Sequence, residues 1–220
     1  MLKALIPVRS GSTRVKNKNL KPFAGSNILT VKIQQLKRIK GLDGIAVNSN
    51  SDEMLDIARS LGVEAIKRDE YYATNNVSIN EVYKNMAENC SCDDILFSNA
   101  TSPLIKDETI EKCIKKYYSL EGIYDSLATV NEVKEFMWLN GKPINYDLNN
   151  KPRSQDLPDI VAVNHAIGIL PRKIMIEKRD MMGYKPYLYK IDLVEAVDID
   201  NEIDFDFAEF VYKRNLNAKI

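Results

Sequence analysis

The 220-residue sequence is poor in the residues that build disulfide-stapled or zinc-stapled folds, with three cysteines and one histidine. Cys90, Cys92 and Cys113 match neither the spacing of a disulfide framework nor that of a zinc site. We expect the Cys90–Cys92 pair to lie in a loop. This cysteine usage fits a reducing compartment, so we expect the protein to be cytoplasmic.

Long apolar runs and an excess of one charge are also missing. No segment approaches the roughly 20 apolar residues of a membrane helix, and the N-terminal apolar stretch is too short for a signal peptide. Lysine plus arginine and aspartate plus glutamate each number 31, so the net charge is zero. Without a basic field, neither nucleic acid nor anionic lipid is an expected partner.

The chain is rich enough in apolar residues to build a core, with 45% hydrophobic and 28% charged residues. Through the first half, apolar runs alternate with amphipathic segments. This alternation predicts a doubly wound, mostly parallel α/β sheet with helices on both faces, formed by a single domain over residues 1–220. We expect strands over 2–8, 44–49, 63–67 and 94–99, and helices over 28–39, 52–61, 78–89 and 106–118.

The second half has a different pattern. We expect strands over 127–130, 134–139, 142–147, 161–170 and 186–192, and a final helix over 204–214. Asn140-Gly141 is a hairpin turn signal, which predicts a hairpin insertion at about 131–158. Phe136, Trp138 and Tyr146 lie on a hairpin too small to form a core, so we expect this insertion to make a homodimer.

Charges of opposite sign are segregated along the chain. Five basic residues and no acid occur between Arg9 and Lys21, whereas eight acids and no base occur between Asp192 and Glu209. Each run begins where a predicted strand ends, and ligands of such sheets lie beyond the carboxyl ends of the strands. Two solvated stretches would explain either run alone. Together they suit a polyphosphate, which needs cations, and its metal, which needs carboxylates.

The basic run has the composition of a phosphate-binding loop, although it has neither a Walker A nor a G-x-G-x-x-G motif. Gly11 and Ser12 allow backbone N–H groups to face an anion. Arg9 and Lys18 can offset the charge of a triphosphate and of a departing pyrophosphate. The alternative is an exposed basic loop.

Two acids suit a metal. Asp198 and Asp200 are two residues apart at a predicted strand end, where both side chains would point to one face and share a hard cation. Asp204 and Asp206 fall at the start of the final helix, where acids complement the helix dipole.

Five segments together resemble the CMP-sialic acid synthetase (acylneuraminate cytidylyltransferase) family. IPVRSGSTRVKNKNLKPFAG is similar to the family pattern IPARGGSKGIPRKNIRPLAG. Four more segments match in order along the whole chain: VNSNSDEMLDIARSLGVEAIKRDEYYA, NATSPLI, RSQDLP followed by VNHAIGI, and VDIDNEIDFDFAE.

The resemblance implies transfer of CMP from CTP to a sugar acid, with release of pyrophosphate. The acceptor would be a nonulosonic acid such as sialic, legionaminic or pseudaminic acid. It implies Mg²⁺ on Asp198 and Asp200 and a family-like dimer through the insertion. It assigns the nucleotide to Arg9, Ser12, Lys18, Asn19, Arg68 and Ser78, and catalysis to Arg9, Lys18 and Asp200. The candidate acceptor residues are Asn99, Arg153 and Gln155.

The chain departs from the family pattern at positions that leave the acceptor open. Asn99 replaces a glutamine, His165 replaces a glycine, and Asn50 stands where the family has an acid. A lone histidine is more often packed and hydrogen-bonded than catalytic. Another acid acceptor, such as 3-deoxy-octulosonate or a phosphonate, therefore remains an alternative. A glycosyltransferase of related topology and a nucleotide-binding regulator without turnover are the others.

Overall fold

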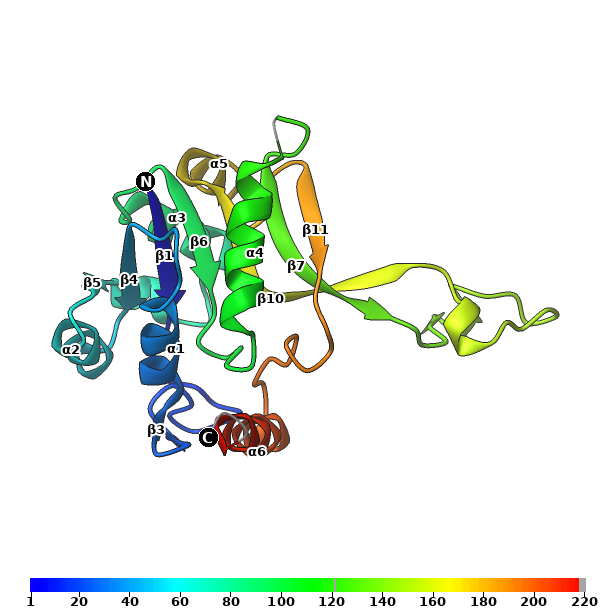
Figure 1. The fold of residues 1–220 in the computed structure, drawn as a ribbon, viewed down its shortest axis with the longest axis horizontal. Helices are drawn as coiled ribbons and strands as arrows, with labels where there is room; N and C mark the ends of the chain where they lie inside the picture. Colours follow the sequence, from blue (N-terminus) through cyan, green and yellow to red (C-terminus); the bar gives the residue numbers. More distant parts are fainter. Residues whose placement is uncertain (121, 218–220) are drawn as a thin grey trace.

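The computed structural model describes residues 1–120 and 122–217 and has a seven-stranded sheet with helices on both faces (Figure 1). The strand order is β11-β7-β10-β6-β1-β4-β5, and β10 runs antiparallel to both of its neighbours. The sheet strands are β1 (Leu2–Pro7), β4 (Gly44–Ser49), β5 (Glu64–Lys67), β6 (Asp94–Ser98), β7 (Ser126–Val133), β10 (Ile160–Pro171) and β11 (Pro186–Lys190). This confirms the predicted doubly wound, mostly parallel sheet.

The smaller elements lie between these strands. Two short antiparallel pairs are β2 (Pro22–Phe23) with β3 (Ser26–Asn27), and β8 (Trp138–Leu139) with β9 (Lys142–Pro143). The helices are α1 (Ile28–Leu36), α2 (Asp52–Ser60), α3 (Ile79–Glu88), α4 (Asp107–Tyr118), α5 (Arg172–Lys178) and α6 (Glu202–Asn217), with short 3₁₀ turns η1 (Glu70–Ala73) and η2 (Ser154–Asp156).

The core has one layer on each face of the sheet because side chains alternate along the strands. On β1, Ala4 and Ile6 pack with α1, α2, α4 and α6, whereas Leu5 packs with α3 and α5. Local signals place the helix ends as expected. Ser51 caps α2 by accepting from Met54 N, and Gly62 follows the helix with a φ of +70°.

The second half differs from the prediction in two places. Helix α5, which follows Pro171, was not predicted, because seven residues are too few to show a clear helical period. The expected strands over 134–139 and 142–147 shrink to β8 and β9, two residues each. Their turn is nevertheless the one that Asn140-Gly141 predicts, with φ values of +51° and +76°.

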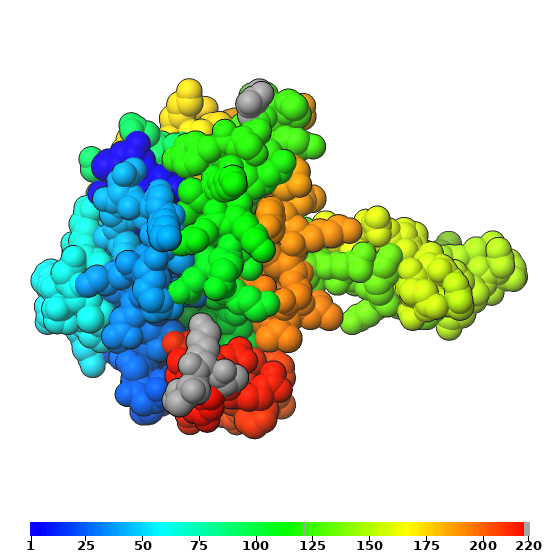
Figure 2. Space-filling view, viewed as in Figure 1, coloured from blue at the N-terminus to red at the C-terminus, as the bar shows by residue number. Residues whose placement is uncertain are grey.

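The ends of β7 and β10 and the hairpin between them form an arm that projects from the body (Figures 1 and 2). Within the arm, the rings of Phe136 and Tyr146 pack edge to face, with their centroids 4.9 Å apart. Trp138 donates from Nε1 to the Tyr146 hydroxyl at 2.7 Å but stays 52% exposed. The arm thus carries aromatic surface that its own chain does not cover.

No described helix combines the length and the apolar character needed to cross a membrane.

A fully buried lysine lies under the loop that follows β6. Lys32 on α1 is 0% exposed, and its Nζ donates to Gln35 Oε1 at 2.8 Å and to the Ser102 carbonyl at 2.9 Å. Burial lowers the pKa of Lys32 from 10.5 to about 7, although Asp107 acts in the opposite direction. Two acceptors match the two N–H groups of a neutral amine, so the environment is suited to the uncharged form.

This burial makes the stability of the protein depend on pH. Between pH 7 and pH 10.5 the unfolded chain keeps the proton on Lys32 and the folded protein releases it, so raising the pH favours folding. We expect wild type to gain roughly 2–5 kcal/mol relative to Lys32→Met over this interval. Denaturant unfolding of both proteins at several pH values measures the difference. Parallel stability curves would show that Lys32 does not titrate in this way.

Candidate active site

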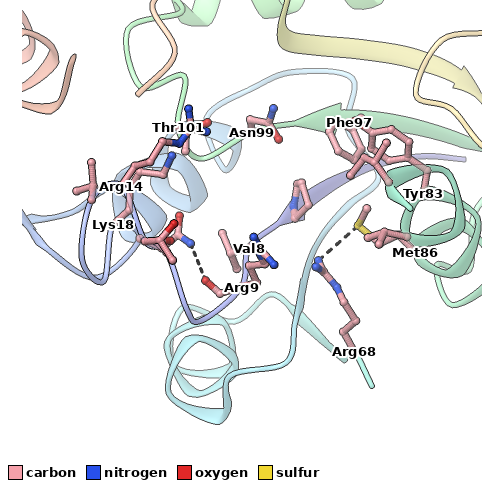
Figure 3. Close-up of a pocket in the computed structure, with 17 residues that line it drawn as sticks. Val8, Arg9, Arg14, Lys18, Arg68, Tyr83, Met86, Phe97, Asn99 and Thr101 are labelled. Atoms are coloured by element: carbon pink, nitrogen blue, oxygen red, sulfur yellow. Dashed lines mark hydrogen bonds between the residues drawn. The ribbon is translucent and has the colours of Figure 1, made fainter. Parts of the chain in front are cut away.

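A cavity of about 330 Å³ opens at the carboxyl ends of the parallel strands (Figure 3). The chain passes from β1 to β4 and β5 on one side, and then returns to place β6 on the other side of β1. Ligands of open α/β sheets bind at such a reversal of strand order. Six of the residues predicted for substrate binding line this cavity: Arg9, Ser12, Lys18, Asn19, Arg68 and Asn99.

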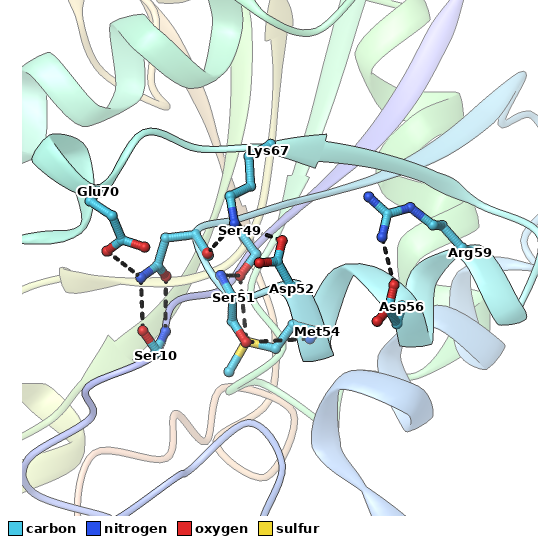
Figure 4. A network of polar contacts seen from close by, with 10 residues as sticks. Ser10, Ser49, Ser51, Asp52, Met54, Asp56, Arg59, Lys67 and Glu70 are labelled. Atoms are coloured by element: carbon cyan, nitrogen blue, oxygen red, sulfur yellow. Dashed lines mark hydrogen bonds and ion pairs between the residues drawn. The ribbon is translucent and has the colours of Figure 1, made fainter.

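Polar contacts with the neighbouring segments shape the start of the basic loop (Figure 4). Ser10 donates from its backbone N to Asn50 Oδ1 at 3.0 Å. The Asn50 amide donates to Ser10 Oγ at 2.8 Å and to Glu70 Oε2 at 3.0 Å. An aspartate could not donate to these two oxygens. The departure from the family pattern at Asn50 therefore has a structural reason, which is the presence of Glu70.

Asn19 and Gly11 complete the loop. Asn19 is buried and donates from Nδ2 to the Arg9 carbonyl at 3.2 Å, which ties the two ends of the loop together. Gly11 has a φ of +80°, a conformation that glycine adopts without strain.

Arg68 is a buried cation with no ion pair among the described residues. Its Nε donates to Asn48 Oδ1 at 2.6 Å and its Nη2 to the Asn48 carbonyl at 2.9 Å. Burial, together with the nearby Arg9, lowers the pKa of Arg68 to about 10, so it stays charged at neutral pH. A buried charge without a counter-charge is unfavourable unless an anion binds there. Arg68 thus makes the cavity a site for an anion.

Arg9 lies beside Arg68 and is anchored by the segment after β5. Its guanidinium donates to the Ala73 carbonyl at 2.6 Å and to Asn75 Oδ1 at 2.8 Å. Lys18 and Arg14 lie on the other side of the cavity, as Figure 3 shows. Arg14 pairs with Asp200 at 2.8 Å, and Lys18 Nζ is 3.9 Å from the same carboxylate. Burial lowers the pKa of Lys18 despite the nearby Asp198 and Asp200.

The expected position of Asp198 and Asp200 at a strand end was wrong. Strand β11 ends at Lys190, and both aspartates lie in an irregular segment before α6. The segment is held instead through Ile199, whose N donates to the Thr101 carbonyl at 2.9 Å and whose carbonyl accepts from Lys18 Nζ. With Ile199 in the core, the flanking carboxylates stay at the cavity edge.

These two carboxylates fit a divalent cation that phosphates also ligate. Burial raises the pKa of Asp198, while a Thr101 hydrogen bond acts in the opposite direction. Asp198 Oδ1 is buried without a hydrogen-bond partner in the described part of the chain. The same residues contain no group of three or more histidine, cysteine or acidic side chains around one point. Mg²⁺ is commonly held by one or two carboxylates plus substrate phosphates, which is the donor set available here.

Asp204 has the helix role expected of it. Its Oδ2 accepts from the backbone N of both Asp200 and Asn201 at 2.9 Å, at the start of α6.

Besides Asp198 and Asp200, which contact lining residues without lining the cavity themselves, three predicted residues do not line it. Ser78 is the N-cap of α3 and accepts from Glu81 N at 3.3 Å, next to Ile79 in the cavity wall. Arg153 and Gln155 lie on the arm, where Arg153 pairs with Asp156 at 2.7 Å. The arm projects from the body of the chain (Figure 1), whereas Asn99 lines the cavity, so within one chain these two residues are not part of the same lining.

Sequence reasoning missed several residues of the cavity. Thr101 and Arg14 lie in motifs that were identified in the sequence, but the contacts that they make could not be predicted. Tyr83, Met86 and Phe97 form an apolar wall opposite Lys18 (Figure 3). Asn48 lies in the VNSNSDE motif, but its contact with Arg68 spans 20 residues and could not be predicted from that motif.

Comparison with known proteins identifies the family of this chain. The family model described as cytidylyltransferase matches residues 3–215. Pseudaminic acid cytidylyltransferase of Campylobacter jejuni is 25% identical, covering 96% of both chains. CMP-N,N'-diacetyllegionaminic acid synthase of Legionella pneumophila is 26% identical, covering 99% of this chain and 98% of the relative. Flagellin modification protein B of Campylobacter coli is 26% identical, covering 97% and 96%.

Solved structures share the fold. CMP:2-keto-3-deoxy-manno-octonic acid synthetase complexed with CTP superposes with a TM-score of 0.70 at 12% identity, covering 97% of this chain and 99% of that one. These findings confirm the family resemblance of the sequence motifs. The chain belongs to the cytidylyltransferase family.

Proposed function

We propose that this protein transfers CMP from CTP to a nonulosonic acid and releases pyrophosphate. The observation that carries the proposal is a buried Arg68 without an ion pair in the cavity wall, together with two carboxylates, Asp198 and Asp200, that lie against other residues of the same wall. Cations and carboxylates close to one another are what a metal-bound triphosphate requires. The names of the full-length relatives, which act on pseudaminic and legionaminic acids, support this class of acceptor.

The chemistry depends on positioning and charge rather than on a protein nucleophile. The acceptor hydroxyl attacks the α-phosphorus in line, and the bond to the departing pyrophosphate breaks. Arg9 and Lys18 would stabilise the negative charge that develops on the leaving group. Asp198 and Asp200 would hold Mg²⁺, which supplies Lewis acidity at the α-phosphate when bound.

Two alternatives are weaker. A 3-deoxy-octulosonate acceptor is supported by the likeness to the synthetase structure, but at 12% identity that likeness concerns the fold. A regulator that only binds a nucleotide would not need a buried, unpartnered carboxylate oxygen such as Asp198 Oδ1.

We further propose that the protein acts as a homodimer through the arm. Trp138, Leu139 and Ile144 are exposed on it, and apolar surface of this kind is normally covered by a partner. If Arg153 and Gln155 bind the acceptor, they do so in the cavity of the second copy.

The three free cysteines fit a cytoplasmic location.

The substrate assignment is tested by incubating the protein with CTP, MgCl₂ and one acid at a time, followed by mass spectrometry for the CMP conjugate. The panel is pseudaminic acid, N,N'-diacetyllegionaminic acid, N-acetylneuraminic acid and 3-deoxy-octulosonic acid. We expect conjugates with one or more of the nine-carbon acids. Conjugation of 3-deoxy-octulosonic acid alone would favour the alternative acceptor.

In the same buffer, CTP should raise the melting temperature more than ATP or GTP, and equal stabilisation would argue against a cytidine site.

Asp200 should matter for turnover rather than for folding. Asp200→Asn removes a carboxylate that lies near the phosphates, so we expect kcat to fall about 100-fold or more, as for loss of a main electrostatic stabiliser. The KM for CTP should change less, since the basic loop remains. Steady-state kinetics at saturating Mg²⁺, together with the melting temperature, measures both effects.

The matched control is Asp206→Asn, which removes an exposed acid of α6 away from the cavity lining. Its kcat should stay near that of wild type. A normal kcat in Asp200→Asn would exclude this metal site, and a collapsed melting temperature would make Asp200 structural.

The dimer is tested by replacing an aromatic side chain of the arm. Trp138→Glu places a charge on the proposed contact, so it should convert a dimer to a monomer in light scattering at micromolar concentration. Tyr118→Glu, on the exposed end of α4, is the control and should leave the mass unchanged. A monomeric wild type would refute the proposal.

A further inference from the structure

His165 lies in a bulge of β10 beside the cavity. The pairing of β10 with β7 shifts between Val163, which faces Val130, and Gly168, which faces Ala128. The four residues 164–167 therefore face Thr129 alone. Bulges bend a strand locally and change the direction of a side chain, often next to active sites.

Buried hydrogen bonds fix the shape of this bulge. Thr129 Oγ1 donates to Asn164 Oδ1 at 2.7 Å and accepts from Ile167 N at 3.0 Å. Ala166 N also donates to Asn164 Oδ1, at 3.2 Å. Thr129 and Asn164 are both buried. The bulge is thus held by specific side chains, and His165 has little freedom to leave its conformation.

That conformation is unfavourable for histidine. His165 has a φ of +56°, and a non-glycine residue in a sparsely populated region costs of order 1–3 kcal/mol. The family pattern has glycine here, which adopts a positive φ without strain. The side chain is exposed, so it adds little to the core in return. Of the packed and hydrogen-bonded histidine that was expected, only the polar contact, with Met181, is found, and the strain calls for another explanation.

The main chain of His165 contacts a residue of the cavity lining, and its side chain lies beside that lining without being part of it. Asn99, which lines the cavity, donates from Nδ2 to the His165 carbonyl at 3.2 Å. The imidazole is also close enough to Asp198 to affect the pKa of that carboxyl, although burial and Thr101 affect it more. His165 is thus near the carboxylates and on the β6–β10 side. Arg9 and Arg68 approach the cavity from the segments that follow β1 and β5.

The contact of Nδ1 determines what the other ring nitrogen can do. Nδ1 lies 3.1 Å from the sulfur of Met181. A thioether sulfur can only accept, so Nδ1 carries the proton in this contact. In the neutral ring, Nε2 then has a free lone pair, and it makes no hydrogen bond with any residue in 1–120 or 122–217. Such a nitrogen accepts a hydrogen bond from a hydroxyl group.

We propose that His165 is an acceptor-recognition residue, whose Nε2 accepts a hydrogen bond from a hydroxyl of the sugar acid. This inference rests on the proposed function, because it assigns the β6–β10 side of the cavity to the acceptor. It also gives a role to the strain: the bulge holds the ring at the acceptor side, where glycine would leave no side chain to make the bond.

The test is steady-state kinetics of His165→Gly and His165→Asn, with CTP and with whichever acid of the panel wild type converts. Glycine fits the backbone without strain, so the melting temperature should stay or rise while the KM for the acid increases about tenfold or more. Asparagine tolerates a positive φ and offers an amide oxygen as acceptor, so it should retain part of the wild-type affinity. The KM for CTP should change less than twofold in both variants.

The outcomes separate this inference from the proposed function. If wild type converts no acid of the panel, the proposed function fails and the inference fails with it. If wild type turns over and His165→Gly keeps the wild-type KM for the acid, the inference alone is overturned. Equal increases in both KM values would mean that the bulge supports the whole cavity, which also overturns it. Should His165→Gly unfold, the acid KM of His165→Asn decides.

Discussion

The site depends on the way the main chain of Ile199 is held. Its N–H is bound by the Thr101 carbonyl after β6, and its carbonyl by Lys18 of the basic loop, 181 residues away in sequence. Because these bonds use the backbone, they place the acidic segment without using either carboxylate. Asp198 and Asp200 remain available at the cavity edge, although β11 ended well before them. A strand end is therefore not needed to present a pair of carboxylates.

The same docking brings opposite charges together. Arg14 and Lys18 approach Asp200, and Lys21 pairs with Glu202. These pairs are partly exposed, so each contributes little to stability. Because these ion pairs are weak, other charged groups can replace either partner easily. In the proposed reaction, a triphosphate would offer the cations new partners and a divalent cation would offer the carboxylates new partners, so nucleotide and metal together would replace the internal pairs without leaving a charge unpaired. Arg68 differs, since it is buried and donates to the neutral Asn48 and the Met86 sulfur rather than to a carboxylate.

Much of the architecture could be predicted because it is encoded locally. Alternating apolar runs, the Ser51 cap and the Asn140-Gly141 turn each act over a few residues, and all agree with the sheet observed. The basic loop and the NATSPL segment were located for the same reason, since they follow strands.

What could not be predicted depends on distant contacts. Asn48 stabilises Arg68, Glu70 explains Asn50, and Lys32 is buried under a loop 70 residues away. No local sequence pattern predicts such contacts. The exposure of the His165 side chain could not be predicted either, because the bulge that exposes it depends on Thr129 of another strand. The separation of Arg153 and Gln155 from Asn99 follows from the length of the arm, which the sequence pattern does not show.

The predicted motif residues and most of the residues that differ from the family pattern lie on different sides of the cavity. The side that would hold the nucleotide is built from motif residues whose backbone is fixed within the chain, such as Asn19 bound to Arg9 and Ser10 bound to Asn50. The β6–β10 side contains two of the three departures from the family pattern, Asn99 and His165, which contact each other through the His165 carbonyl. A substitution at one of them therefore changes the surroundings of the other. Because the phosphates contact neither of these side chains in the proposed arrangement, this side can change its acceptor while the transfer chemistry stays the same.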